Sequence, residues 1–317
     1  NDMQIEKFMQ KMSDGTEISV NRWIPENEEN IKAIVVFSHG MQEHALRYDR
    51  VGSEFAEHGY LFSAHDHRGH GKTAYYAEAN KTGMFGKLAD KNGFEKVTSD
   101  LDEIIDEVKK DYPGKKVILF GHSFGSFVAQ NYIEQHGDKI SACILCGTSG
   151  PRKGLVKDKI FVNLSCLFLG KNCRSKFCQN LAFGSYNNRF KAENDSLSWL
   201  SKNPANRMMY KNDSWCGGVS TVSFFRDLAH GLSKIHKASN MKKIPAELPV
   251  LAVYGSDDPV GNYGKSIEKL LEIYRKNGVK NVSSKIYEGD RHEILNEANS
   301  DEILSDIFNW IEKNVSL

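Results

Sequence analysis

The sequence predicts an α/β fold: a mostly parallel, eight-stranded sheet with helices on both faces and an inserted, mainly helical segment. Short apolar runs alternate along the chain with segments of helical periodicity, which is typical of parallel strands joined by helices. This alternation stops between about residues 150 and 220 and then resumes. The 317 residues, of which 40% are hydrophobic, suffice for one large domain with such an insertion.

The expected elements follow in chain order. Residues 4–11 and 17–24 are expected to form an opening hairpin around Asp14-Gly15. The other six strands are the apolar runs at residues 34–37, 60–64, 117–120, 140–145, 250–254 and 284–287. Apolar residues at helical spacing predict helices over 48–58, around Val97, Leu101, Ile104 and Val108, from Ser123 onward, and around Ile303, Ile307 and Trp310.

Composition excludes several classes of protein. The formal net charge of +1 gives no reason to expect nucleic acid as a partner. No apolar run approaches the roughly 20 residues that a transmembrane helix needs. The start of the chain, residues 1–6, lacks the basic and apolar regions of a signal peptide, so we expect a cytoplasmic protein.

The segment Gly121-His122-Ser123-Phe124-Gly125 directly follows a predicted strand and opens a predicted helix. A serine hydroxyl is a poor nucleophile until a base takes its proton, so its oxygen must be held exposed. A sharp strand-to-helix turn exposes it, and glycine at Gly121 and Gly125 removes the Cβ atoms that would clash there. We therefore predict Ser123 as a nucleophile.

A base and an acid follow in the order that such a site requires. Asp258 lies just after the strand at 250–254, and His292 just after the strand at 284–287. Both strands end at the carboxyl edge of the sheet, where sites of such folds lie. The imidazole of His292 can take the serine proton near neutral pH, and a buried carboxylate can orient it. We favour Asp258 as this acid, with Asp257 as the alternative.

A serine mechanism also needs two hydrogen-bond donors for the oxyanion, each worth roughly 3–4 kcal/mol. We predict the backbone N–H groups of Phe124, which follows the nucleophile, and of Met41, in the loop after the strand at 34–37. No cofactor and no metal are expected. His65, His67 and His70 lack an accompanying acidic ligand pattern, and the loop at 69–73 lacks the first glycine of a phosphate-binding loop.

These motifs resemble the monoacylglycerol lipase and lysophospholipase branch of the α/β-hydrolases, the serine aminopeptidase S33-like group. The matching residues are His39-Gly40-x-x-Glu43-His44, Asp66-x-Arg68-Gly69-His70-Gly71, Gly121-His122-Ser123-x-Gly125, Gly255-x-x-Asp258, His292-Glu293-x-Leu295-x-Glu297, Trp199-Leu200 and Tyr210-x-x-Asp213-x-x-Cys216-Gly217. The resemblance implies the α/β-hydrolase fold and hydrolysis of carboxylic esters through an acyl-enzyme, with monoacylglycerol or lysophospholipid as substrate. Phe124 and Ser126 depart from the pattern, since many relatives have methionine and glycine there.

The chain is expected to divide into an α/β-hydrolase core, residues 1–149 and 220–317, and a cap or lid, residues 150–219. The cap holds twelve Lys and Arg against four acidic residues, a surplus of eight positive charges. This surplus and the apolar runs at 160–162 and 166–169 suit transient contact with an anionic lipid surface. A solvated cap whose apolar residues pack on the core is the plainer interpretation.

Two other functions stay open at this point. An aminopeptidase or amidase would use the same three residues but would need an acidic anchor for the substrate amine. A hydrolase-fold protein that only binds a ligand would carry the scaffold without the reaction.

Overall fold

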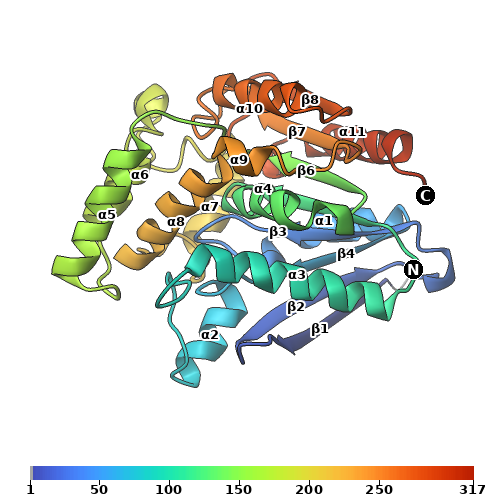
Figure 1. The fold of residues 1–317 in the computed structure, drawn as a ribbon, viewed down its shortest axis with the longest axis horizontal. Coiled ribbons are helices and arrows are strands. Elements are labelled where there is room, and N and C mark those ends of the chain that lie inside the picture. The colour runs from blue at the N-terminus through green and yellow to red at the C-terminus, as the bar shows by residue number, and fades with distance from the viewer. Residues whose placement is uncertain (1–2) are drawn as a thin grey trace.

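Eight strands form one mixed sheet in the order β1-β2-β4-β3-β5-β6-β7-β8 in the computed structural model, which describes residues 3–317 (Figure 1). The strands are β1 (Gln4–Lys11), β2 (Glu17–Ile24), β3 (Ala33–Ser38), β4 (Tyr60–His65), β5 (Val117–His122), β6 (Ala142–Cys146), β7 (Val250–Gly255) and β8 (Val282–Tyr287). Strand β2 pairs antiparallel with β1 and β4, and all other pairs are parallel. The predicted mostly parallel, eight-stranded sheet is confirmed. Asn1 and Asp2, part of the start considered above, lie outside the described residues.

Alternate residues of the central strands enter two separate hydrophobic clusters. In β5, Val117 and Leu119 belong to one cluster, and Ile118 and Phe120 to the other. Successive side chains of a strand point to opposite faces, so a strand buried on both sides is apolar throughout. Figure 1 shows helices on both sides of the sheet, as the apolar strands require.

The helices of the two faces draw on different parts of the chain. The first cluster includes residues of α3 (Gly93–Asp111), α4 (Phe124–His136), α8 (Val222–Ile235) and α10 (Lys265–Lys276). The second includes residues of α1 (Asp49–Glu57) and α11 (Ser300–Asn314). Helices α2 (Gly71–Ala79), α8, α9 (Ala238–Met241) and α10 were not among the expected elements. Strand β6 begins two residues later than expected, and β8 two residues earlier.

The segment between β6 and α8 holds no named strand and is mainly helical. It contains α5 (Leu155–Leu169), α6 (Lys176–Phe183), the 3-10 helix η4 (Asn188–Glu193) and α7 (Pro204–Asn212). In Figure 1, α5 and α6 project beyond one end of the sheet, next to α8. Within residues 3–317, no helix has the length and apolar character that crossing a bilayer would take.

Candidate active site

Ser123 occupies a strained turn between β5 and α4. Its backbone φ of 54° and ψ of −122° form a conformation that residues other than glycine rarely adopt. A Cβ atom on Gly125 would lie 1.9 Å from the carbonyl oxygen of Ser38, and one on Gly121 would lie 2.4 Å from the carbonyl oxygen of Gly125. Because neither position has room for a side chain, both glycines are needed for the turn to form.

The structure brings Ser123, His292 and Asp258 together in a hydrogen-bonded line. Nε2 of His292 lies 2.8 Å from Oγ of Ser123, and Nδ1 lies 2.9 Å from Oδ2 of Asp258. The ionised carboxylate only accepts, so Nδ1 carries the imidazole proton and Nε2 is left to accept from the serine hydroxyl. Asp258 is fully buried, and its other oxygen accepts from the N–H of Val260. Asp257 makes no such contact with His292.

The charge state of His292 follows from its surroundings. Burial lowers the pKa of His292, but the charge of Asp258 and the hydrogen bond to it raise that pKa, and the net value lies above the usual 6.5. Glu293 and Glu43 raise this pKa further. The imidazole is therefore a stronger proton acceptor than an ordinary histidine.

Two backbone N–H groups, those of Phe124 and Met41, flank Ser123. Phe124 begins α4, and Met41 lies in the turn after β3; both residues line the same pocket as Ser123. In the described chain, neither N–H donates a hydrogen bond to another protein group. A Cβ atom on Gly40 would lie 3.2 Å from Cβ of Ser123, so glycine here lets the Met41 loop approach the nucleophile. Both groups are thus free to donate to a substrate oxygen.

Buried histidines hold the Met41 loop in place. The N–H of His67 donates to Nε2 of His39, so Nδ1 of His39 carries a proton and donates to the carbonyl of Gly40. Burial and nearby histidines lower the pKa of His39 well below its usual value, which keeps the ring neutral. The ring of His70 stacks on Phe124 with an interplanar angle of 16°. His39, His67 and His70 therefore each contact neighbouring protein groups that fix their positions.

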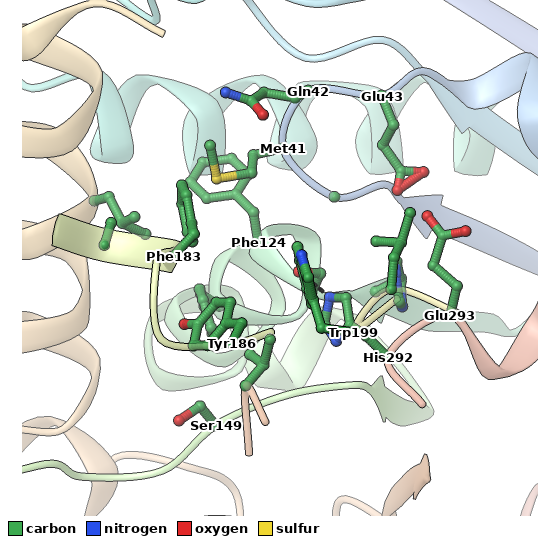
Figure 2. Close-up of a pocket in the computed structure, with 18 of the residues that line it drawn as sticks. Met41, Gln42, Glu43, Phe124, Ser149, Phe183, Tyr186, Trp199, His292 and Glu293 are labelled. Atoms are coloured by element: carbon green, nitrogen blue, oxygen red, sulfur yellow. Dashed lines mark hydrogen bonds between the residues drawn. The ribbon is translucent and has the colours of Figure 1, made fainter. Parts of the chain in front are cut away.

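A pocket opens over Ser123 and is apolar on one side and polar on the other. Figure 2 shows Phe183 and Tyr186 on one side of Trp199, and Glu43 and Glu293 on the other. The apolar wall is built by Phe124, Phe127, Ala182, Phe183, Leu228, Leu232 and Val260. Leu228 and Leu232 come from α8, which the sequence analysis did not predict. Such a pocket suits an ester with one apolar and one polar part.

The two carboxylates of the polar side are already engaged. Arg47 donates to both oxygens of Glu293 at 2.7 and 2.9 Å, and Asn206 donates to Glu293 at 2.7 Å. Tyr48 donates to Glu43 at 2.9 Å. Burial raises the pKa of Glu43 to about 7. Burial also acts to raise the pKa of Glu293, but Arg47, His122 and Asn206 together lower it to about 2. Below neutral pH, Glu43 is protonated and Arg47 balances Glu293, so this end of the pocket carries no net charge.

Two groups of side chains in residues 3–317 have the composition of a metal site. One is Glu43, His122 and Glu293, where the Arg47 guanidinium already supplies the positive charge. The other is His44, Asp213 and Cys216, where Nε2 of His44 lies 2.6 Å from Oδ2 of Asp213. The histidines considered in the sequence, His65, His67 and His70, form neither group.

Comparison with known proteins places this geometry in a family. The family described as serine aminopeptidase, S33, matches residues 29–299. The chain belongs to this family. The monoacylglycerol lipase of Mycolicibacterium smegmatis is 25% identical over 300 residues, which cover 94% of this chain and 93% of that one. The human monoglyceride lipase is 25% identical over 308 residues, covering 96% and 88%.

Solved structures superpose on this chain over nearly its whole length. A thermostable carboxyl esterase from Bacillus coagulans, solved with glycerol, superposes with a TM-score of 0.88 at 26% identity and covers 99% of this chain and 100% of its own. A monoglyceride lipase variant from Saccharomyces cerevisiae superposes at a TM-score of 0.74 and 20% identity, covering 100% and 96%. This S33 family member therefore has the α/β-hydrolase fold and is a hydrolase of the esterase and lipase type.

Proposed function

We propose that this protein is a serine hydrolase that cleaves carboxylic esters of lipids, monoacylglycerol foremost and lysophospholipid second, through an acyl-enzyme. The observation that carries the proposal is the line from Ser123 through His292 to Asp258, with contacts of 2.8 and 2.9 Å, at the base of a pocket with an apolar side and a side that carries Glu43 and Glu293. The relatives named monoacylglycerol lipase support the substrate class.

The proposed reaction has two halves. Oγ of Ser123 attacks the ester carbon while its proton passes to Nε2 of His292, and the N–H groups of Met41 and Phe124 stabilise the oxyanion. The intermediate collapses, the C–O bond to the alcohol breaks, and His292 returns the proton to that leaving oxygen. Water then attacks the acyl-enzyme with His292 again as base, which releases the fatty acid and restores Ser123. Asp258 keeps the proton on Nδ1 throughout.

The two carboxyl groups of the polar side, Glu43 and Glu293, favour monoacylglycerol over lysophospholipid. A glycerol headgroup needs only hydrogen bonds, whereas a phosphate would lie near the carboxylate of Glu293, whose charge Arg47 already balances. We expect kcat/KM for monoacylglycerol to exceed that for lysophosphatidylglycerol of the same acyl chain by about tenfold or more. Equal values for the two lipids would contradict this order of preference.

Active-site labelling tests the mechanism directly. A fluorophosphonate probe should modify Ser123, and Ser123→Ala should abolish both labelling and hydrolysis of p-nitrophenyl butyrate. A control substitution, Ser233→Ala on α8, outside the pocket, should change neither. Full esterase activity of Ser123→Ala would defeat the assignment. A wild-type protein that is folded but inert to the probe would instead favour the binding-protein alternative.

An aminopeptidase would need an acidic group in the pocket to bind the substrate amine. Two such groups line the pocket, but both already have hydrogen-bond partners in the protein. Glu43 and Glu293 both line the pocket, yet Glu293 is matched by Arg47, and the raised pKa of Glu43 keeps it largely uncharged below neutral pH. Below neutral pH, a substrate ammonium would therefore meet little free negative charge. Comparing monoacylglycerol with an aminoacyl naphthylamide distinguishes the two, and faster amide hydrolysis would favour the aminopeptidase.

As a partner, we propose an anionic lipid surface that contacts the outer face of α5. This face carries Val156, Ile160, Leu164, Leu167 and Phe168, whose exposed fractions run from 49% to 80%. Their spacing of three and four residues places them on one side of the helix, while Val162 and Ser165 are buried on the other. The exposed Lys153, Lys157 and Lys171 lie nearby in the chain. Apolar residues rimmed by lysine suit an anionic membrane surface.

Vesicles of defined composition test this contact. Binding to vesicles of phosphatidylglycerol should exceed binding to phosphatidylcholine and should weaken as salt increases. The double variant Leu167→Ser/Phe168→Ser should lose most of the binding while it keeps activity on a soluble ester. The matched control is Met208→Ser/Met209→Ser, which removes two exposed apolar residues of α7. Unchanged binding of the α5 variant would overturn the proposal.

A further inference from the structure

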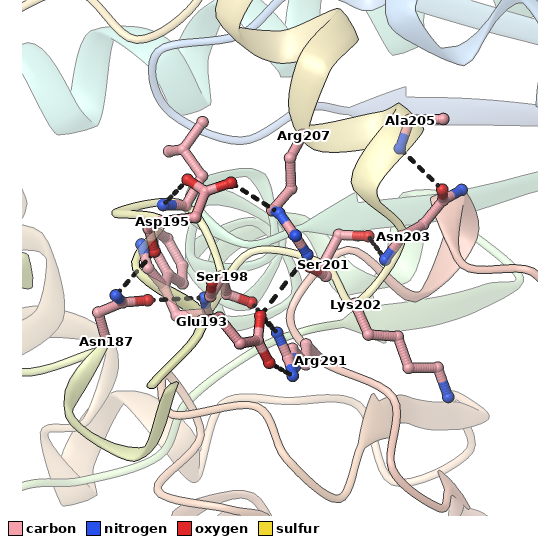
Figure 3. A network of polar contacts seen from close by, with 12 residues as sticks. Asn187, Glu193, Asp195, Ser198, Ser201, Lys202, Asn203, Ala205, Arg207 and Arg291 are labelled. Carbon is pink, nitrogen blue, oxygen red and sulfur yellow. Dashed lines mark hydrogen bonds and ion pairs between the residues drawn. The ribbon is translucent and has the colours of Figure 1, made fainter. Parts of the chain in front are cut away.

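The middle of the inserted segment, residues 187–217, is bonded to the loops that carry the active-site groups; we call it the cap bracket. Its first link is to Arg291, the residue before His292. The Arg291 guanidinium donates to both carboxylate oxygens of Glu193 and, at 2.7 Å, to the carbonyl of Ser198 (Figure 3). It also lies 3.9 Å from the centroid of the Phe190 ring. Arg291 is only 9% exposed.

The backbone on either side of the imidazole is bonded to the same segment. The N–H of His292 donates to the carbonyl of Trp199 at 3.4 Å, and the N–H of Glu293 donates to the carbonyl of Leu200 at 2.8 Å. The Trp199 ring faces the imidazole with its centroid 5.3 Å away. Backbone and side chains of the His292 loop are therefore both held from the cap bracket.

A second link holds the loop of Met41. Gln42, the next residue, has a φ of 56°, in the left-handed region that costs a residue other than glycine roughly 1 kcal/mol. Its carbonyl accepts from the hydroxyl of Tyr210 at 3.0 Å and from the N–H of Gly217 at 3.0 Å. His44, two residues further on, lies 2.6 Å from Asp213. These contacts from the cap bracket support a strained backbone directly beside Met41.

Helix α5 is attached differently. It packs on α8, with hydrogen bonds from Lys159 to Ser233 and between Asn163 and His230. Across residues 3–317, no hydrogen bond joins α5 to the loops at 39–44, 256–263 or 288–293. The cap bracket is therefore hydrogen-bonded to the active-site loops, whereas α5 is not.

We propose that the cap bracket is a positioning element of catalysis, which orients His292 through Arg291 and fixes the backbone of Met41 through Gln42, whereas α5 has no such part. Arg291, Glu193 and Tyr210 are then positioning residues that touch no reacting atom. The proposal rests on the functions proposed above for His292 and Met41. The cap bracket would then contribute to the chemical step itself and not only to the admission of substrate.

Two substitutions separate the two links. Glu193→Gln removes the charge that holds Arg291, and Tyr210→Phe removes one donor to Gln42 without changing the size of the ring. With p-nitrophenyl butyrate, each should lower kcat about five- to tenfold and change KM by about twofold or less. Glu193→Gln should also move the acid limb of the pH–rate profile to lower pH, because a less well oriented imidazole gains less from Asp258, Glu43 and Glu293. Tyr210→Phe should leave that limb in place, because His292 is untouched.

The control is Asp90→Asn. Asp90 pairs with Lys171 of the cap at 2.9 Å and, like Glu193, joins the cap to the sheet body through an ion pair, but it contacts no active-site loop. It should leave kcat and the pH–rate profile unchanged. If Glu193→Gln and Tyr210→Phe behaved like this control, or lost activity only in proportion to the unfolded fraction seen by circular dichroism, the cap bracket proposal would fail. Wild-type protein inert to the fluorophosphonate probe would instead indicate failure of the proposed function.

Discussion

At the scale of single residues, the candidate site centres on the hydrogen-bonded line from Ser123 through His292 to Asp258. Asp258 is fully buried and its carboxylate has two partners, His292 and the N–H of Val260. The neighbouring Asp257 is partly exposed. Burial lowers the pKa of His292, but Asp258, with smaller contributions from Glu293 and Glu43, raises it so that the net pKa lies above its usual value. The ring centroid of His122 lies 4.9 Å from that of His292. Burial lowers the pKa of His122 to about 3 and so keeps it neutral.

The first prediction concerns the choice of acid. Asp258→Asn should reduce kcat on the order of 10³- to 10⁴-fold, because the amide no longer favours the imidazole tautomer that accepts from Ser123. Asp257→Asn should stay close to wild type. Steady-state kinetics with p-nitrophenyl butyrate measures both, and the reverse result would assign the acid to Asp257.

The pH dependence follows from the same residues. Only neutral His292 accepts the serine proton, so activity should fall as pH drops through the His292 pKa, which lies above 6.5. In Asp258→Asn, the residual activity should keep its plateau to lower pH, since the group that raises the pKa is lost. Rates measured from pH 5 to 9 test this, and an acid limb that did not move would contradict the electrostatic account.

At the scale of elements, the acyl side of the pocket depends on α8. Leu228 and Leu232 of this helix line the pocket together with Phe124 and Phe127 of α4. Leu232→Trp should fill part of this wall and lower the ratio of kcat/KM for dodecanoyl to butyryl esters by about tenfold. Ser233→Ala, one residue further on, is the matched control. An unchanged chain-length profile would mean that the acyl chain lies elsewhere.

The strands and their loops could be predicted from the sequence, while α8 could not. Runs such as Val117–Phe120 are apolar throughout because both faces are buried, and they end where Ser123, Asp258 and His292 begin their loops. Helix α8 directly follows an irregular segment, so the start of its apolar pattern is hard to recognise in the sequence. The network of Glu43, Arg47 and Glu293 joins residues about 250 positions apart, a proximity that only the folded chain reveals. Its one signal in the sequence was the pair of motifs Glu43-His44 and His292-Glu293.

At the scale of the whole molecule, charge is unevenly distributed between the inserted segment and the sheet body. The basic surplus lies in residues 150–219, and the rest of the chain is acidic. Most of these charges are exposed, but Glu134 of α4 is only 4% exposed, and neither carboxylate oxygen has a hydrogen-bond partner. Burial raises the pKa of Glu134 to about 9, and Lys234 and Lys243 offset this only in part.

Glu134 should make stability depend on pH. A carboxyl whose pKa is raised in the folded state is protonated there but ionised in the unfolded chain, so stability should fall as pH rises from about 4.5 to 9. Glu134→Gln removes this cost and should raise Tm by several degrees at pH 8, with little effect at pH 5. Thermal unfolding at both values tests it, with the exposed Glu302→Gln as control. A gain that was the same at both values would contradict the burial argument.

The active-site line joins two residues that are 169 positions apart, Ser123 and His292. During synthesis, the strained turn at Ser123 leaves the ribosome long before the last strand and its histidine do. A nascent chain with only the first half of the sheet has a serine hydroxyl with no group to deprotonate it. On the proposed mechanism, a fragment that ends before residue 292 should therefore not react with a serine-directed probe.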